Sequence, residues 1–300
     1  MPAGTKAIQR RIKSVTNTKK ITKAMEMVSA AKMRRATDGV LATRPYSQLA
    51  WQIIENISKS KSEVAHPLLE VRKGEGKIMV ILISSDKGLC GSFNSQMFRE
   101  LKQFLTIGGR DSDSIKFVIL GKKGELFASR EGLEVEATFE DLTNKPKFTD
   151  IKPIAKMAMD KFTDNTYNKI FIAYTDYIST LVQKPRVRQL LPIIQDEDLG
   201  SVEGEPSAVS GKPLANDYIF EPEQKRLLNM LLPKIVETQI YQAVLESVAS
   251  EQSARMVAMK NATDAATDMV KDLMLTFNKI RQAGITREIS EISAGKAALE

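Results

Sequence analysis

The stretch LLPKIVETQIYQAVLESVASEQSARMVAMKNATDAATDMVKDLMLTFNKIRQAG, residues 231–284, decides the fold. It holds the last proline of the chain, Pro233, and no glycine before Gly284. Two series of residues spaced by seven run through it, as in a coiled coil diluted with Ala, Thr and Gln. The first series is Leu231, Thr238, Leu245, Gln252, Met259, Ala266, Leu273 and Ile280, and the second is Ile235, Gln242, Ala249, Met256, Thr263, Val270, Phe277 and Gly284.

This pattern predicts one helix from about Pro222 to about Ala294, on the order of 110 Å long at 1.5 Å per residue. The N-terminal segment offers it a partner helix, because no Gly or Pro lies between Thr5 and Asp38. Apolar residues recur there at helical spacing, at Ile8, Ile12, Val15, Ile21, Met25 and Val28. We therefore predict an antiparallel coiled coil of the two ends, whose longer C-terminal helix is either exposed at its end or enclosed by another protein.

Between the two helices the hydrophobic pattern changes: the continuous apolar run at 77–83 predicts a buried strand, and further strands are predicted at 115–120, 169–174 and 181–190. Helical segments are predicted at 93–105, 121–132 and 151–162. This alternation predicts a mainly parallel, Rossmann-like α/β domain, so the fold class combines α/β and α+β features. The predicted organisation is an N-terminal helix (1–60), the α/β domain (70–195), an acidic surface loop (196–220, with Gln195–Lys212 richest in polar residues) and a C-terminal helix (221–300). Pro45 either kinks the first helix or starts a second one.

Composition excludes several classes of protein. With 42% hydrophobic residues among 300, the chain can bury a core and is not wholly disordered. No apolar run approaches the ~18–20 residues of a membrane-spanning helix. One His and one Cys argue against a cysteine-based metal cluster and against Cys-His catalysis. We predict no catalytic residue, no cofactor and no metal site.

Positive charge is concentrated at the N-terminus. Residues 1–44 carry eleven Lys and Arg against two acidic residues, whereas the whole chain has a net charge of +7. Such an arm can bind nucleic acid, anionic lipid or an acidic protein surface, or act as a cleaved transit peptide. The apolar helical pattern continues through the arm, which argues against cleavage, and we favour a negatively charged partner surface.

The loop SSDKGLCG, residues 84–91, is the most enzyme-like feature. It lacks the G-x-G-x-x-G and G-K-[ST] patterns of nucleotide-binding loops, so we interpret it as a tight turn with positive φ angles. Cys90 is interpreted as a small packing residue, and His66, before Pro67, as a surface residue. A nucleotide-dependent α/β enzyme stays as a minor alternative.

Four segments together resemble the gamma subunit of F-type ATP synthases. They are ITKAMEMVSAAKM (21–33), SDKGLCGSFN (85–94), ARMVAMKNATD (254–264) and ITREISEISAG (285–295). They occur in the family's order and span most of the chain. The residue after the last glycine is Lys296, where the family usually has Ala.

The resemblance implies a rotary central stalk that couples rotation of the membrane c-ring to ATP synthesis in a hexamer of alternating alpha and beta subunits, with the epsilon subunit alongside. It implies no active site on this chain and a peripheral position on the cytoplasmic face of a bacterial inner membrane. Residues expected to face the catalytic subunits are Lys20, Lys23, Met25, Lys32, Arg34, Arg35, Arg255, Arg281, Gln282, Thr286 and Glu288. Those expected to face the ring or epsilon are Asp86, Lys87, Gly88 and Asn94. The alternative is a basic coiled-coil protein that binds nucleic acid.

Overall fold

A computed structural model describes residues 3–59, 66–72, 76–107, 114–142, 146–193 and 224–297. The chain divides into two compact units. The first unit comprises residues 1–30 and 255–300, and the second comprises residues 31–254. Two long helices, α1 (Ala3–Lys59) and α5 (Gln224–Ala297), each contribute residues to both units. The acidic segment predicted at 196–220, including most of Gln195–Lys212, lies outside the described residues.

Both predicted long helices are present. α5 has 74 residues, with Pro233 in its first turns, and starts two residues after the predicted position. α1 has 57 residues and continues through Pro45 to Lys59, so Pro45 neither ends it nor starts a separate helix. The pairing of long helices provides the burial that such lengths require, because isolated helical propensity would not sustain them.

A five-stranded sheet forms the centre of the second unit. Its strands are β1 (Ile78–Ile83), β2 (Ile115–Leu120), β3 (Val135–Phe139), β4 (Lys169–Tyr177) and β5 (Gln183–Leu191). They lie in the order β3-β2-β1-β4-β5, with parallel pairs except for the antiparallel hairpin of β4 and β5. This order winds outward in both directions from β1, as in doubly wound α/β folds. The mainly parallel Rossmann-like prediction is therefore confirmed.

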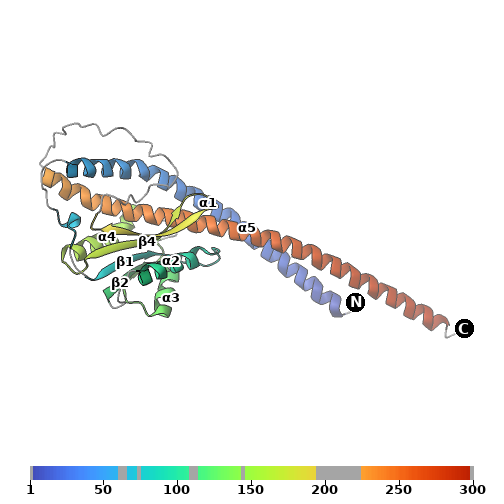
Figure 1. Ribbon diagram of the computed structural model, residues 1–300. Coiled ribbons are helices and arrows are strands. Elements are labelled where there is room, and N and C mark those ends of the chain that lie inside the picture. The colour runs from blue at the N-terminus through green and yellow to red at the C-terminus, as the bar shows by residue number, and fades with distance from the viewer. Residues whose placement is uncertain are drawn as a thin grey trace. The chain divides into compact units, whose positions relative to one another are not determined.

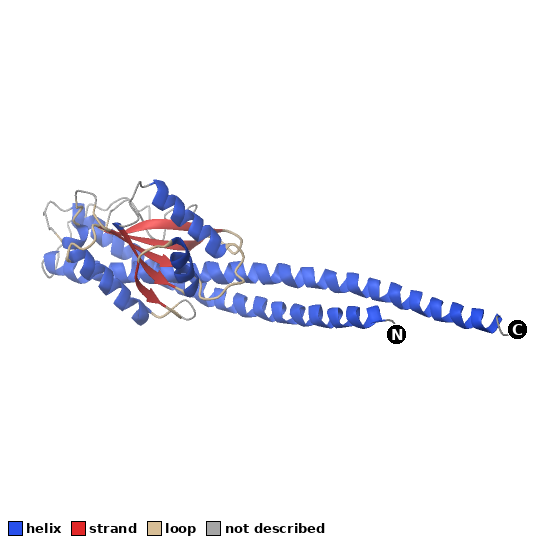
Figure 2. Ribbon diagram, turned by 90° about the horizontal axis from the view of Figure 1, so that it is seen from below, coloured by secondary structure: helices blue, strands red, loops and turns tan. Residues whose placement is uncertain are grey.

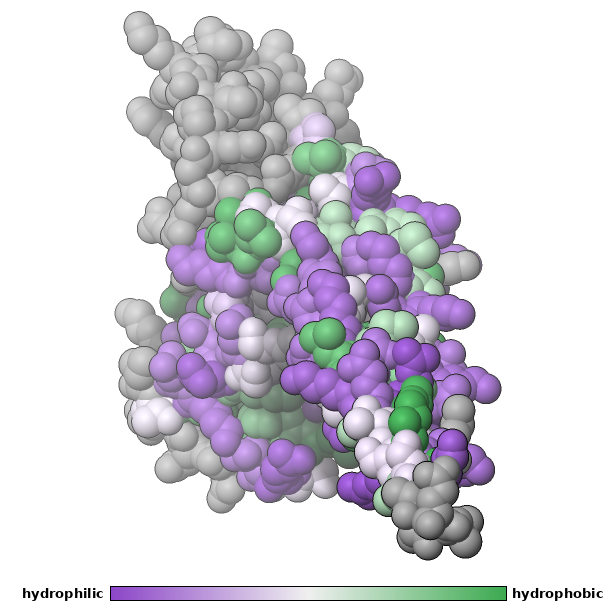
Figure 3. Space-filling model, turned by 90° about the vertical axis from the view of Figure 1, so that its right-hand side faces the viewer, coloured by the Kyte–Doolittle hydropathy of each residue, from purple (hydrophilic) through white to green (hydrophobic). Residues whose placement is uncertain are grey.

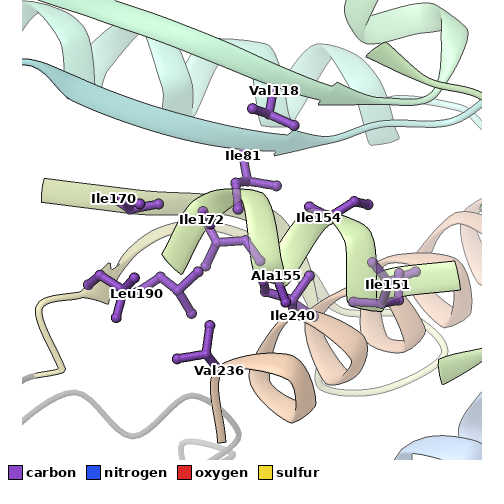
Figure 4. Close-up of a cluster of buried hydrophobic side chains, with 14 of the residues drawn as sticks. Ile81, Val118, Ile151, Ile154, Ala155, Ile170, Ile172, Leu190, Val236 and Ile240 are labelled. Carbon is purple, nitrogen blue, oxygen red and sulfur yellow. The ribbon is translucent and has the colours of Figure 1, made fainter. Parts of the chain in front are cut away.

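Helices cover both faces of the sheet (Figure 1). On one face, α2 (Phe93–Ile107) and α3 (Lys122–Glu131) bury Met97, Leu101 and Phe127 against the strands. On the other, α4 (Phe148–Thr163) and the first part of α5 pack against them, and Figure 4 shows Ile154 and Ile240 among the strand side chains. A short 3-10 helix, η1 (Pro67–Leu69), adds Leu68 to that cluster. The runs predicted as strands at 77–83, 115–120 and 169–174 are thus buried on both sides, whereas β5, predicted at 181–190, is mostly half-exposed.

Two local features differ from the predictions. β3 was not predicted, because its sequence VEATF has a glutamate and lies at the sheet edge with no fully buried residue. The surface role predicted for His66 is also wrong. His66 is half-buried and caps η1, where its Nδ1 accepts a hydrogen bond of 3.1 Å from the Leu68 amide. Burial lowers the pKa of His66, while a hydrogen bond with Asn229 opposes this shift.

Candidate partner-binding surfaces

The first unit is an antiparallel pair of helices. Figures 1 and 2 show its α1 and α5 segments side by side, with the N- and C-termini at the same end of the unit. The α5 positions that face α1 alternate in steps of three and four, as in a coiled-coil seam. Each is buried or half-buried: Met256, Met259, Thr263, Ala266, Val270, Leu273, Phe277, Ile280 and Gly284. These nine residues belong to the two predicted series, so the seam of α5 is confirmed.

On the α1 side of the seam, the predicted positions Ile8, Ile12, Val15 and Met25 are half-buried, whereas Ile21 and Val28 are not. The buried or half-buried positions continue through Lys19, Thr22, Glu26 and Ser29. The predicted apolar positions Ile21 and Val28 point outward and are 60% and 56% exposed. The sequence pattern was misleading because polar residues occupy the inner face here, leaving apolar residues on the outer face.

A buried pair of hydroxyl groups connects the two helices. Thr22 Oγ1 and Thr263 Oγ1 are 2.8 Å apart and hydrogen-bonded. Each hydroxyl also lies within hydrogen-bond distance of a carbonyl oxygen of its own helix, of Lys19 (3.1 Å) and of Met259 (2.8 Å) respectively. Both side chains therefore have partners within a seam that excludes water. A polar pair of this kind favours one register over alternatives.

The C-terminal part of α5 extends beyond this pairing. Ala3, the first residue of α1, lies nineteen residues before Thr22. Because the helices are antiparallel and Thr22 faces Thr263, Ala3 lies opposite a position about nineteen residues after Thr263, near Gln282. Figure 2 shows α5 continuing past the N-terminal end of α1. The predicted partner residues Arg281, Gln282, Thr286 and Glu288 are all exposed on this free segment.

An apolar stripe also lies on the free segment. Ile285, Ile289 and Ile292 follow each other in steps of four and three, on one helix face, and are 48%, 59% and 73% exposed. Exposed hydrophobic residues appear as separate green patches on the largely hydrophilic face in Figure 3. A row of exposed isoleucines on an unpaired helix is typical of a surface that another protein covers.

The remaining predicted residues of the first unit differ in exposure. Lys20 and Lys23 are exposed, and Lys23 forms an ion pair of 2.9 Å with Glu26 of the next turn. Met25 is half-buried, and Arg255 is only 7% exposed. Arg255 is thus buried and is not an open surface cation. The predicted proximity of Met25 and Arg255 stays a prediction.

In the second unit, basic residues of α1 surround a hollow of about 430 Å³. Half-buried Lys32 and exposed Arg35 line it together with Lys147 and Tyr241, whereas Arg34 is exposed outside it. Its apolar wall consists of Ala36, Gly39, Pro146, Leu245 and Val248. Its described lining residues combine three cations with an apolar wall and include no acidic residue, so the hollow suits an acidic segment that also carries an apolar side chain.

Sequence reasoning missed Lys147 and Tyr241. Tyr241 stacks edge-on against Phe148, with ring centroids 5.5 Å apart, and burial raises the pKa of its hydroxyl. Lys147 immediately precedes α4. No local motif could have found either residue, because only the packing of α4 beside α1 and α5 brings them to Lys32 and Arg35.

The loop after β1 is closed by hydrogen bonds within the protein. Asn94 accepts a bond from the Ser85 amide (3.2 Å) and donates one to Ser85 Oγ (2.7 Å). The Asp86 carboxylate accepts a bond of 3.3 Å from the backbone amide of Lys122, at the start of α3. Leu89 and Gly91 have φ angles of +63° and +58°, so the tight-turn interpretation is confirmed.

Lys87 is exposed and Gly88 half-buried, so the predicted set of Asp86, Lys87, Gly88 and Asn94 comes together around one loop. Cys90 is 3% exposed and its Sγ lies 3.4 Å from Asn94 Nδ2, as its packing role predicts. Among the residues that the structure describes, no three His, Cys, Asp or Glu side chains gather as metal ligands would. None of the described helices has the length and apolarity to span a membrane.

Comparisons with known proteins agree over nearly the full length. A family model described as ATP synthase matches residues 4–299. An ATP synthase gamma chain of Coxiella burnetii is 43% identical over 294 residues, covering 98% of each chain. One from Herpetosiphon aurantiacus is 41% identical over 304 residues, covering 99% of each chain.

Solved structures show the same fold. The central stalk and c-ring of the Tetrahymena thermophila mitochondrial ATP synthase includes a similar chain, 27% identical, with a TM-score of 0.55 over 81% of this chain and 99% of that one. A chain of the Euglena gracilis mitochondrial ATP synthase is 20% identical, with a TM-score of 0.66 over 99% of this chain and 94% of that one. None of these comparisons supports the nucleic-acid alternative.

Proposed function

The chain belongs to the ATP synthase gamma-chain family, and from this premise we propose that it is the rotating central-stalk subunit of a proton-translocating F-type ATP synthase. In this role it couples rotation of the membrane c-ring to ATP synthesis in the hexamer of alternating alpha and beta subunits. The chain supplies no active site of its own, and catalysis takes place in the hexamer.

The observation that carries this proposal is the paired seam of the first unit. A shaft must transmit torque without unwinding, so its two helices must be held to each other along the length that they share. The seam does this with a continuous series of buried and half-buried positions, and the Thr22–Thr263 hydrogen bond fixes the register. One elementary charge that crosses 100 mV supplies about 2.3 kcal/mol, so several such steps per ATP pass through these contacts.

The exposed isoleucines of the free segment support a position inside the hexamer. Ile285, Ile289 and Ile292 would face an apolar sleeve, in which they would be buried yet form no directional bonds that resist turning. Arg281, Gln282, Thr286 and Glu288 would provide polar contacts to a loop of a catalytic subunit from the same segment.

The basic residues support contacts with acidic loops of the catalytic subunits. Lys20, Lys23 and Arg34 present exposed charges, and Lys32 and Arg35 flank the hollow closed by Lys147 and Tyr241. We propose that an acidic loop with an apolar side chain enters this hollow during part of each rotation. Electrostatic complementarity would act here mainly on encounter and specificity.

The loop containing Asp86, Lys87, Gly88 and Asn94 is proposed to face the c-ring or the epsilon subunit. Internal hydrogen bonds hold it in one conformation, so it is a preformed surface. With these partners the protein would be peripheral, on the cytoplasmic face of a bacterial inner membrane.

Rotation of the chain in a reconstituted complex tests the proposal. The hexamer is fixed to a surface, and a bead is attached to this chain through a cysteine introduced on its surface. The natural cysteine, Cys90, is buried and should not react with the label. Unidirectional rotation on addition of ATP, with one copy of the chain per hexamer, is expected. A chain that fails to join the hexamer, or joins it and stays still, contradicts the proposal.

The acidic-loop contact has its own test. Replacing Lys32 and Arg35 together by Ala should weaken binding to the hexamer about three- to ten-fold at low salt, as expected for partly exposed charges. The control is the double variant Arg99→Ala, Arg130→Ala, which removes two exposed cations, one of α2 and one of α3, that do not line the hollow. Equal losses in both variants would show that only net charge matters and would contradict this placement.

A further inference from the structure

The carboxyl end of β4 lacks a strand on one side. β1 pairs with β4 only as far as Leu82 and Ala173. If this parallel pairing continued, the Ser85 amide would donate to the Thr175 carbonyl, but it donates instead to Asn94 Oδ1 (3.2 Å). The sheet therefore offers the amide and carbonyl of Thr175 no partner on the β1 side.

Serine hydroxyls of α5 take the place of the missing strand. The Thr175 amide donates to Ser247 Oγ at 3.0 Å, and Ser250 Oγ donates to the Thr175 carbonyl at 3.2 Å. One step further along the helix, Ser253 Oγ donates to the Thr180 carbonyl at 2.6 Å. The three serines are spaced by three, so each lies about 4.5 Å further along the axis of α5 than the one before.

These contacts are shielded from water. Ser247 and Thr175 are each 2% exposed, and Ser250 and Ser253 are fully buried. A buried backbone group without a partner is costly, so the helix cannot move along the strand without breaking these bonds. Apolar contacts, such as those of Val244 and Val248 in the same turns, tolerate small displacements better because they are not directional.

We propose that Ser247, Ser250 and Ser253 form a latch that fixes the position of α5 along the end of β4, so that torque received by the sheet passes into the shaft helix without slip. These serines are positioning residues and take part in no chemistry. The inference rests on the proposed rotor function, and it adds which contacts join the shaft helix to the α/β sheet.

Hydrogen–deuterium exchange on the full chain, resolved to single amides, tests the latch itself. Ser247→Ala removes the acceptor of the Thr175 amide, and exchange of that amide should become about ten-fold faster. Thr175→Val is the matched control, because Thr175 Oγ1 is buried and has no hydrogen-bond partner among the described residues, so the protection of this amide, corrected for the intrinsic exchange rates of Thr and Val, should stay unchanged. Unchanged exchange in Ser247→Ala would overturn the latch.

Proton pumping by the assembled enzyme tests the positioning role. The Ser247→Ala, Ser250→Ala double variant should pump at least two-fold fewer protons per ATP hydrolysed, with hydrolysis retained. Thr238→Ala is the control, because this hydroxyl is also buried on α5 but donates to its own helix, at Lys234 (2.7 Å). Ser253→Ala, at the end of the latch, gives the same test if the double variant does not assemble.

The exchange and pumping measurements together decide whether the three serines transfer torque. Faster exchange together with a lower pumping ratio supports the proposal. Faster exchange with an unchanged ratio overturns the role in torque transfer, and an equal loss in Thr238→Ala shows general destabilisation and also overturns it. If the unmodified chain itself does not support pumping, the rotor function fails, while the exchange experiment still tests the latch.

Discussion

Replacing the two seam threonines by valine, singly and together, tests the register of the helix pair. In Thr22→Val the Thr263 hydroxyl loses the partner at 2.8 Å but can still donate to the Met259 carbonyl at 2.8 Å. Each single change should therefore cost about 0.5–1.5 kcal/mol, the net value of one hydrogen bond. The double change removes both hydroxyls and leaves two methyl groups facing each other, which is close to neutral or stabilising.

The expected coupling energy between the two sites is about 1–3 kcal/mol, in the sense that the double variant is more stable than the sum of the single changes predicts. The free energy of unfolding of each full-length variant, measured with urea, gives this value. Thr18→Val and Thr276→Val are the control pair, because both hydroxyls are exposed and donate to their own helices. Additive losses for Thr22 and Thr263, like those of the controls, would refute the observed pairing.

Further predictions concern the second unit. Gly121→Ala should destabilise the chain by about 4 kcal/mol or more, because φ is +98° and a Cβ would lie 2.3 Å from the Ser84 carbonyl oxygen. Gly132→Ala, where φ is +68° and the space around a Cβ is open, should cost only about 1–2 kcal/mol. Similar losses of melting temperature in the two variants would contradict this difference. Leu89→Asn should raise the melting temperature slightly, because Asn tolerates the φ of +63° better than Leu; a lower melting temperature would argue against strain there. The pKa of His66 is lowered, so its contribution to stability is present above pH 6.5 and is lost as the pH falls through the folded-state value. His66→Asn keeps a capping acceptor without titrating, so its urea stability should fall less than that of the unmodified chain between about pH 7.5 and about pH 5.5, and an equal fall would contradict the assignment.

The sequence predicted the long helices and the buried strands because their patterns are strong and local. The seven-residue series of α5 and the apolar run of β1 follow from periodicity alone. The edge strand β3 escaped prediction because a half-exposed strand needs few apolar residues. The inward positions predicted for Ile21 and Val28 of α1 were wrong because the polar Thr22 is inside through a hydrogen bond, which hydrophobicity does not reveal.

The candidate surfaces were predicted in part. Exposure of Arg281 and Glu288 follows from the greater length of the C-terminal helix, which the sequence shows. Burial of Arg255 could not be deduced, because it lies outside both seven-residue series and no local pattern marks it as buried. Lys147 joins the hollow only through tertiary packing, so no spacing along the chain indicates it.

The most direct test of the rotor account locks the two ends of the chain to each other. In Thr22→Cys, Thr263→Cys the new thiols replace hydroxyls 2.8 Å apart, and the natural Cys90 is buried elsewhere. The measurement is ATP-driven proton pumping by the assembled enzyme after oxidation, with the disulfide quantified in the same sample. If the two helices turn as one shaft, the disulfide forms and pumping continues. Failure of the disulfide to form, or loss of pumping that a reductant restores, would contradict a rigid paired shaft.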